Sequence, residues 1–276
     1  MKQRSFYLTL WMLILCALAF TSCSDDDDDD VTVEEGIYVL NNGKMGNNNS
    51  TITYYDPVTQ ASDAADVYAA QNGKGLGDSG QDILCEGKYI YLAVYTSNRI
   101  SVMTRDFVEV TSIALLRDGQ PQSPRSLAYA GKKLYVSLYD GYVARINTSD
   151  FTVEAQVKVG RNPEGLAVSN GKLFVANSGG MDYNTPVGYD KTVSVIDLKK
   201  FEVEKTIEVE INPTILITVD NGDVYCISTG NYGDVPNTLQ KIDPKSYAVT
   251  KVGNATEMAT DGKKLYLMYS QYDASW

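Results

Sequence analysis

A short motif recurs along most of this chain and constrains its fold more than any other feature. It consists of a glycine, one or two polar residues, and then alternating apolar and aromatic residues. Copies lie at residues 87–91, 131–136, 171–175, 222–225 and 262–267, and residues 36–40 begin the series. The motif returns roughly every 40–50 residues, and such a period indicates one small structural unit stacked several times.

Each period has room for four short strands. In one of them we predict strands at residues 126–129, 134–138, 142–147 and 152–159, here called A to D in chain order. Asn170-Gly171 and Asn221-Gly222 favour the tight A–B turns, because both residue types accept a positive φ. No window after residue 36 shows helical periodicity, so we expect no helix there. The period and strand content predict an all-β fold, a β-propeller of four-stranded blades.

The first and last repeats bear on the number of blades. Residues 36–40 align with B strands, so the A strand of the first blade would come from the C-terminal end. The sequence stops at Trp276, just past the B strand of the sixth repeat. We therefore expect residues 36–276 to form an incomplete propeller, truncated within blade six and seven-bladed when complete, because unpaired strand edges are otherwise left exposed.

The N-terminal segment has the features of an export signal. Lys2 and Arg4 precede an apolar stretch, so residues 1–22 are predicted to be a signal peptide. Residues 19–23 resemble a bacterial lipobox, which implies that Cys23 is lipidated. Residues 23–35, with aspartate at every position from 25 to 30, are predicted to form a solvated tether. This acidic start is similar to the signal that sends lipoproteins to the outer face of Gram-negative anaerobes, so we expect a lipid-anchored protein of the outer membrane, exposed at the cell surface.

Composition argues against several classes of function. The chain has no histidine, which removes Ser–His and Cys–His nucleophile pairs and histidine-ligated zinc. Its net charge of −11 repels nucleic acid. We therefore expect no enzyme activity, no cofactor, no metal and no nucleic-acid partner.

Cys85 and Cys226 belong to different repeats, and we expect two free, buried thiols rather than a disulfide.

Several segments carry a family resemblance. Residues 160–168, 173–180 and 192–197 resemble the YVTN-type β-propeller repeat, and Asn212-Pro213-Thr214 and Asp243-Pro244-Lys245 repeat parts of it. Together with the lipoprotein-like start, they make the chain similar to surface propeller lipoproteins of gut anaerobes. The resemblance implies the propeller fold, and some members of that group capture cobalamin and pass it to an outer-membrane transporter. It marks no binding residues.

The candidate binding face follows from the topology of such a blade. B–C loops and D–A connections emerge on one face, and here they are long and rich in Asn, Gly and Tyr, which is typical of recognition loops on a rigid scaffold. Such loops are also simply good turns. Tyr95 and Tyr139, near the ends of B strands, either project toward the centre or pack at the rim. The candidate ligand-binding residues are Asn42, Tyr95, Arg125, Tyr139, Arg161, Asn177, Tyr183, Asn231 and Tyr232.

Three functions remain open at this point. The first is a non-catalytic module that captures a small nutrient, such as a corrinoid, for an outer-membrane transporter. The second is a protein-interaction scaffold in a surface complex, with the membrane contacted through the lipid anchor alone. The third is a carboxylate- and metal-dependent lyase or lactonase, which the missing histidine disfavours.

Overall fold

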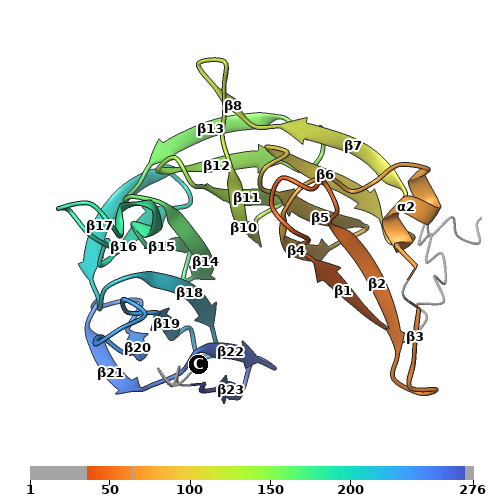
Figure 1. Cartoon of the computed structure of the whole chain (residues 1–276). Coiled ribbons are helices and arrows are strands. Elements are labelled where there is room, and N and C mark those ends of the chain that lie inside the picture. Colours follow the sequence, from red (N-terminus) through yellow and green to blue (C-terminus); the bar gives the residue numbers. More distant parts are fainter. Residues whose placement is uncertain (1–35, 64, 271–276) are drawn as a thin grey trace, which may run out of the picture. The chain divides into compact units, whose positions relative to one another are not determined.

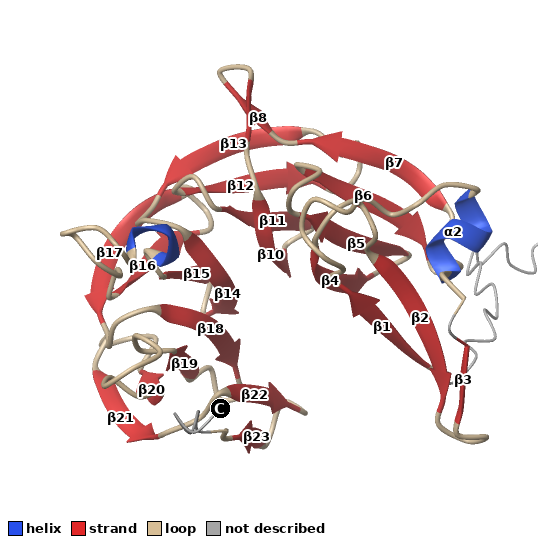
Figure 2. Cartoon of the chain, viewed as in Figure 1, coloured by secondary structure: helices blue, strands red, loops and turns tan. Residues whose placement is uncertain are grey.

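The computed structural model describes residues 36–63 and 65–270, and nearly all regular structure in them is antiparallel sheet (Figures 1 and 2). The predicted signal peptide of residues 1–22, the lipidation site Cys23 and the acidic segment of residues 23–35 lie outside these described residues. Within the described part of the chain, no helix is long and apolar enough to cross a membrane.

Four sheets have four strands each, and neighbouring strands are consecutive in the chain. This confirms the predicted all-β fold of four-stranded blades. The first comprises β4 (Gly80–Glu86), β5 (Tyr89–Val94), β6 (Arg99–Thr104) and β7 (Glu109–Ala114). The second comprises β10 (Pro124–Ala130), β11 (Lys133–Leu138), β12 (Tyr142–Asn147) and β13 (Val153–Lys158). The third comprises β14 (Pro163–Ser169), β15 (Lys172–Asn177), β16 (Thr192–Asp197) and β17 (Glu202–Glu208). The fourth comprises β18 (Pro213–Thr218), β19 (Val224–Ser228), β20 (Thr238–Ile242) and β21 (Val249–Gly253).

Two further sheets of the repeat have fewer strands among the described residues. One comprises β1 (Ile37–Asn41), β2 (Thr51–Asp56) and β3 (Ala61–Asp63), and β1 takes the place of a B strand, as predicted. The other comprises β22 (Glu257–Thr260) and β23 (Leu265–Met268), in the places of A and B. A small hairpin of β8 (Leu116–Arg117) and β9 (Gln120–Pro121) lies within a D–A connection. The complete number of seven blades stays a prediction.

A short helix corrects the expectation that none follows residue 36. Helix α2 (Val67–Asn72) has only six residues, too few for an apolar periodicity to show. Its ends are set by capping instead. The Asp66 side chain accepts a hydrogen bond from the Tyr68 N–H, and Gly73 takes the left-handed conformation at the C-terminus. A single turn of 3-10 helix, η1 (Gly180–Asp182), also occurs in the loop between β15 and β16.

The sheets follow one another with their A strands on the inner side and their D strands on the outer side (Figure 1). Successive A strands pack against each other, from β4 through β10, β14 and β18 to β22. The core consists of apolar side chains between neighbouring sheets. One cluster joins Tyr91 and Ile100 to Leu134 and Val136, and another joins Phe174 to Cys226, so each sheet is stabilised by its neighbours.

Aromatic residues in the C–D turns link each sheet to the one before it. Phe107, Phe151, Phe201 and Tyr247 all have a left-handed backbone, with φ between 56° and 62°. Each ring packs against an aromatic residue of the preceding B strand; the pairs, with distances between ring centroids, are Tyr38–Phe107 (4.5 Å), Tyr89–Phe151 (5.2 Å), Tyr135–Phe201 (6.0 Å) and Phe174–Tyr247 (6.4 Å). The unfavourable backbone conformation is therefore offset by ring packing between sheets.

The two described cysteines are both free thiols, as expected. Cys226 is buried, and burial raises the pKa of its thiol to about 12. Cys85 is exposed, so the expectation that both are buried was wrong for this residue. Cys85 lies near the end of β4, where its side chain contacts the Arg105 guanidinium at the protein surface.

Replacing Phe201 with glycine tests the inter-sheet packing. Phe201→Gly removes backbone strain but also a ring that is 6% exposed, so we expect a net loss of about 2–4 kcal/mol in the free energy of unfolding. Lys132→Gly is the matched control, because Lys132 has the same left-handed backbone (φ 61°) and an exposed side chain. The control should change stability by less than about 1 kcal/mol in urea denaturation. Equal stability of the two variants would contradict this account.

Candidate functional site

The B–C loops and D–A connections lie together on one face, as expected from the topology. In four sheets, the residue that begins the B–C loop donates a backbone hydrogen bond to the connection that precedes the A strand. These bonds are Tyr95 N to Ser79 O (2.8 Å), Tyr139 N to Ser123 O (2.9 Å), Ser178 N to Asn162 O (3.2 Å) and Thr229 N to Asn212 O (2.8 Å). The loops of this face are therefore tied to the rigid inner strands.

Five side chains from three successive sheets meet on this face, and we call them the Arg125 cluster: Gln81, Tyr95, Arg125, Tyr139 and Glu164. The Arg125 guanidinium lies 5.2 Å from the ring centroid of Tyr95 and 4.9 Å from that of Tyr139. It donates twice to the Glu164 carboxylate, from Nε to Oε2 (2.7 Å) and from Nη2 to Oε1 (3.0 Å). Its remaining Nη1 donates to the Gln81 amide oxygen.

These side chains meet because three of them occupy the same place on successive A strands. Gln81, Arg125 and Glu164 each follow the first paired residue of β4, β10 and β14. In each strand the pairing register shifts at that point, and such irregularities redirect a side chain out of the ladder. The repeat itself therefore places the three polar groups side by side at the inner edge.

Burial and pairing set the electrostatics of the Arg125 cluster. The side chains of Arg125 and Glu164 are 24% and 12% exposed, so each depends on the other for charge compensation. Burial raises the pKa of the Glu164 carboxyl above its ordinary value, although Arg125 opposes that rise. Burial also raises the pKa of Tyr139 to about 12. The Arg125 cluster therefore offers two aromatic rings and several hydrogen-bonding groups to a ligand. Its one cation, Arg125, is already paired with Glu164.

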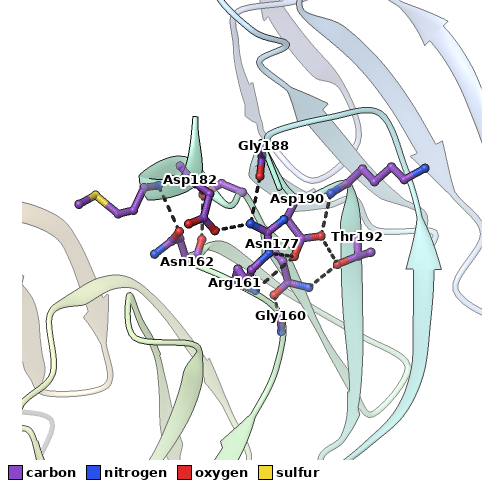
Figure 3. Close-up of polar contacts among 12 residues, drawn as sticks. Gly160, Arg161, Asn162, Asn177, Asp182, Gly188, Asp190 and Thr192 are labelled. Atoms are coloured by element: carbon purple, nitrogen blue, oxygen red, sulfur yellow. Dashed lines mark hydrogen bonds and ion pairs between the residues drawn. The ribbon is translucent and has the colours of Figure 1, made fainter. Parts of the chain in front are cut away.

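A second group of side chains fixes the long loop between β15 and β16, residues 178–191. We call it the Arg161 cluster: Arg161, Asp182, Gly188 and Asp190 (Figure 3). The Arg161 guanidinium forms an ion pair with Asp182, donates to the Gly188 carbonyl at 3.0 Å and lies 3.6 Å from the Asp190 carboxylate. Arg161 thus joins residues near both ends of the loop, which gives the loop a defined conformation.

Asn177 lies in the interior beside the Arg161 cluster (Figure 3). Its Oδ1 accepts from the Gly160 N–H at 3.1 Å, and its Nδ2 donates to the hydroxyls of Thr192 and Ser194, both at 3.0 Å. A Cβ on Gly160 would lie 2.4 Å from Asn177 Cγ, so only glycine fits there. The amide is fully engaged within the protein, and its evident role is to hold the loop base.

Two asparagines that precede prolines connect the loops, and neither is among the residues predicted to bind a ligand. Asn162 and Asn212 both have left-handed backbones, with φ of 46° and 60°. The Asn162 amide donates to the Tyr139 carbonyl at 2.9 Å and accepts from the Met181 N–H at 3.1 Å, which joins the two clusters. Asn212 donates its Nδ2 to the Gly230 carbonyl (3.0 Å) and its backbone N–H to the Asp190 carbonyl (2.8 Å). The Asn-Pro pair occurs twice, at residues 162–163 and 212–213, and this repetition is the sequence feature that could have identified both asparagines.

The structure brings most of the candidate residues to one region. Tyr95, Arg125 and Tyr139 share a cluster, and Arg161 and Asn177 lie next to it. Tyr183 lies on the loop of residues 178–191, and Asn231 and Tyr232 lie on the loop of residues 229–237. Asn42 is separate: it lies in the loop between β1 and β2, is exposed, and its carbonyl accepts from the Ser50 hydroxyl of the same loop. Their roles in ligand binding stay predictions.

Other parts of the described chain offer less. A hollow of about 310 Å³ lies between β13 and the strands β16 and β17, lined by Lys158, Val159, Gly160, Thr192, Ser194, Val203 and Thr206. It has one charged side chain and includes no member of the Arg125 cluster. In residues 36–63 and 65–270, no group of three or more acidic or cysteine side chains could hold a metal ion. The loop face is therefore the candidate site.

Successive four-stranded antiparallel sheets, each with its first strand on the inner side (Figure 1), are typical of a β-propeller. Residues 35–264 match the family described as "Domain of unknown function (DUF5074)", and the chain belongs to that family. No curated protein matches it. The finer resemblance to YVTN-type and cobalamin-capturing propellers stays a prediction.

Many solved structures share the fold, with 1232 matching chains, so the fold alone does not select a function. One is hydrazine synthase of Kuenenia stuttgartiensis, with 18% sequence identity and a TM-score of 0.62. The match covers 79% of this chain and 67% of that chain.

This match corrects the expectation that the chain is not an enzyme. Hydrazine synthase is an enzyme, so a chain of this fold can belong to a catalyst, and fold cannot support the exclusion. At 18% identity the likeness shows the fold alone and assigns no reaction to this chain.

Removing one charge of the buried pair should destabilise the protein. Glu164→Gln leaves Arg125 partly buried without its counter-charge, and we expect a loss of about 1–3 kcal/mol in the free energy of unfolding. Glu208→Gln is the control, because the Lys191–Glu208 ion pair is exposed and should contribute less than about 1 kcal/mol. Urea denaturation of the three proteins at low salt measures both effects, because urea, unlike guanidinium chloride, does not screen ion pairs. A loss no larger than that of the control would contradict the proposed dependence of Arg125 on Glu164.

Asp82, next to Gln81 on β4, should make stability depend on pH. Burial raises the pKa of its carboxyl to about 6, although the Leu127 N–H donates to it at 2.7 Å. The folded protein binds this proton more tightly than the unfolded chain does. The protonated carboxyl therefore makes its full contribution to the free energy of unfolding below about pH 4, and this contribution is lost as pH rises through about 6. Asp82→Asn removes this loss, so its stability relative to wild type should rise by up to about 2–3 kcal/mol between pH 4 and pH 7.

Asp56→Asn is the control for the pH experiment. The Thr59 hydroxyl donates to its exposed carboxylate and lowers the pKa of Asp56, so its contribution is lost only below about pH 4 and the relative stability of this variant should stay nearly constant between about pH 4 and pH 7. A pH-independent difference for Asp82→Asn would show that the carboxyl does not titrate in this range.

Proposed function

We propose that this chain is a ligand-binding β-propeller, held at the outer-membrane surface by a lipid on Cys23, whose loop face captures a small nutrient. The observation that carries the proposal is the convergence of Tyr95, Arg125 and Tyr139 into one cluster at the inner ends of neighbouring sheets. Rings with a polar end offer broad apolar contact together with hydrogen bonds, at small cost in side-chain entropy.

The charges of the site favour a neutral, amphipathic ligand. Arg125 is neutralised by Glu164, and Arg161 by Asp182 and Asp190, so neither arginine offers an unpaired cation to an anion. A corrinoid is a broad, flat ligand whose edge carries many amides, and it fits aromatic faces beside amide and carboxylate acceptors. The similarity to cobalamin-capturing propeller lipoproteins supports cobalamin as the specific candidate and an outer-membrane transporter as the recipient.

A protein-interaction scaffold is the second candidate, and one observation favours it. Met181 and Val187 on the loop of residues 178–191 are largely exposed, and exposed apolar side chains on an ordered loop are typical of contact surfaces between proteins. The same face would then contact a membrane partner rather than a nutrient.

Calorimetric titration of the purified chain with cyanocobalamin tests the first proposal. We expect one-to-one binding, weakened at least tenfold in Tyr95→Leu, because the leucine keeps apolar volume but loses the ring next to Arg125. Tyr129→Leu is the control, since Tyr129 lies near the opposite end of β10 from Arg125 and should not affect affinity. If neither cyanocobalamin nor another corrinoid binds and a membrane protein co-purifies instead, the scaffold is the correct function.

A further inference from the structure

Two loops on the proposed binding face form a surface distinct from the Arg125 cluster. They are residues 178–191, between β15 and β16, and residues 229–237, between β19 and β20. Asn212 lies between their bases and is 3% exposed. Its backbone N–H donates to the Asp190 carbonyl of one loop and its side chain to the Gly230 carbonyl of the other. The two loops are therefore fixed side by side.

This loop pair presents three tyrosines. Tyr183 is 60% exposed and Tyr232 is 71% exposed. Tyr189 is half-buried, and burial raises the pKa of its phenol, with the phenols of Tyr232 and Tyr183 adding to the rise. Because Asn212 holds the two loops side by side, Tyr183 and Tyr232 lie on neighbouring loops, and both rings present most of their surface to solvent.

Tyr232 holds its exposed ring on a left-handed backbone. Its φ of 57° is left-handed, a conformation that costs a bulky residue on the order of 1–3 kcal/mol. Phe107 and Phe201 adopt the same conformation, but their rings are buried between sheets. Tyr232 gains no such packing. Asn231 maintains the turn by accepting from the N–H groups of Gly233 (3.0 Å) and Val235 (2.9 Å).

The polar groups around these rings indicate the class of ligand. The two loops contain one cation, Lys191, and it pairs with Glu208, so an anionic ligand finds no free partner there. The other polar groups are hydroxyls, amides and the carboxylates of Asp182, Asp190 and Asp234, which bind hydroxyl groups well. A neutral sugar ring combines an apolar C–H face, suited to stacking on tyrosine, with hydroxyls around its edge.

We propose that Tyr183 and Tyr232 form a binding platform for a neutral saccharide. This goes beyond the proposed function, because it assigns a second class of ligand to a different part of the same face. The rings stack on the sugar, while Asp234 and the other acceptors of the two loops bind its hydroxyls. Asn231 and Asn212 are positioning residues that hold the platform in place.

Calorimetric titration of the purified chain with neutral hexasaccharides tests the platform. The probes are maltohexaose, cellohexaose, xylohexaose and mannohexaose, with hexagalacturonic acid as the acidic comparison. We expect at least one neutral probe to bind and the acidic one to bind at least tenfold more weakly. Tyr183→Ala and Tyr232→Ala should each weaken binding at least tenfold, whereas Tyr232→Phe should retain it. Tyr266→Ala is the control, because Tyr266 is an exposed tyrosine on β23 and should have no effect.

The glycine variant separates binding from folding. Tyr232→Gly removes the left-handed strain, so its denaturation midpoint should equal or exceed that of wild type while saccharide binding is lost. Absence of binding to every neutral probe, or binding unchanged in both alanine variants, would overturn the proposal. So would a membrane protein that co-purifies through Tyr183 and Tyr232 when no saccharide binds.

Titration of the same variants with cyanocobalamin distinguishes a failure of the saccharide platform from a failure of the proposed corrinoid capture. Corrinoid binding without saccharide binding refutes the platform and leaves the proposed nutrient capture intact. Saccharide binding that depends on the two tyrosines, without corrinoid binding, supports the platform and refutes the corrinoid.

Discussion

The fold depends on aromatic packing between consecutive sheets at strained turns. Phe201 is representative: its left-handed backbone is unfavourable, and the contact of its ring with Tyr135 of the preceding sheet offsets that cost. The same arrangement recurs at the C–D turns of four sheets. An isolated four-stranded sheet would expose both apolar faces, so these contacts, with the core between sheets, turn a series of hairpins into one domain.

The rigid inner edge determines what the variable loops can do. Register shifts at the start of successive A strands direct Gln81, Arg125 and Glu164 toward one another, and their mutual hydrogen bonds satisfy groups that would be costly to bury alone. Asn162 and Asn212 then fix the loops to this edge. The clusters and the tyrosine platform therefore rest on backbone geometry that repeats from sheet to sheet.

The repeat made most of the fold predictable from the sequence, because strand period and turn residues act locally. The predicted strands of residues 126–159 agree with β10 to β13 within a few residues. Helix α2 was missed because its capping residues, not its periodicity, define it. The meeting of Tyr95, Arg125 and Tyr139 was predicted only as a shared face, since their contacts depend on register shifts between sheets. The ion pair with Glu164 could not be predicted for the same reason. The burial of Asn177 depends instead on hydrogen bonds to the Gly160 backbone and to two hydroxyls of β16, which no sequence pattern announces.

The closure of the 178–191 loop by Arg161 has a consequence for how this protein could diversify. Asp182 and Gly188 are held by one guanidinium, so the five residues between them form a tip whose sequence the scaffold hardly constrains. Mutations there, at positions such as Tyr183 or Val187, would alter what the loop recognises without unfolding the sheets beneath it. Related chains could therefore acquire new binding specificities by changing only these five residues, while the sheets keep the same structure.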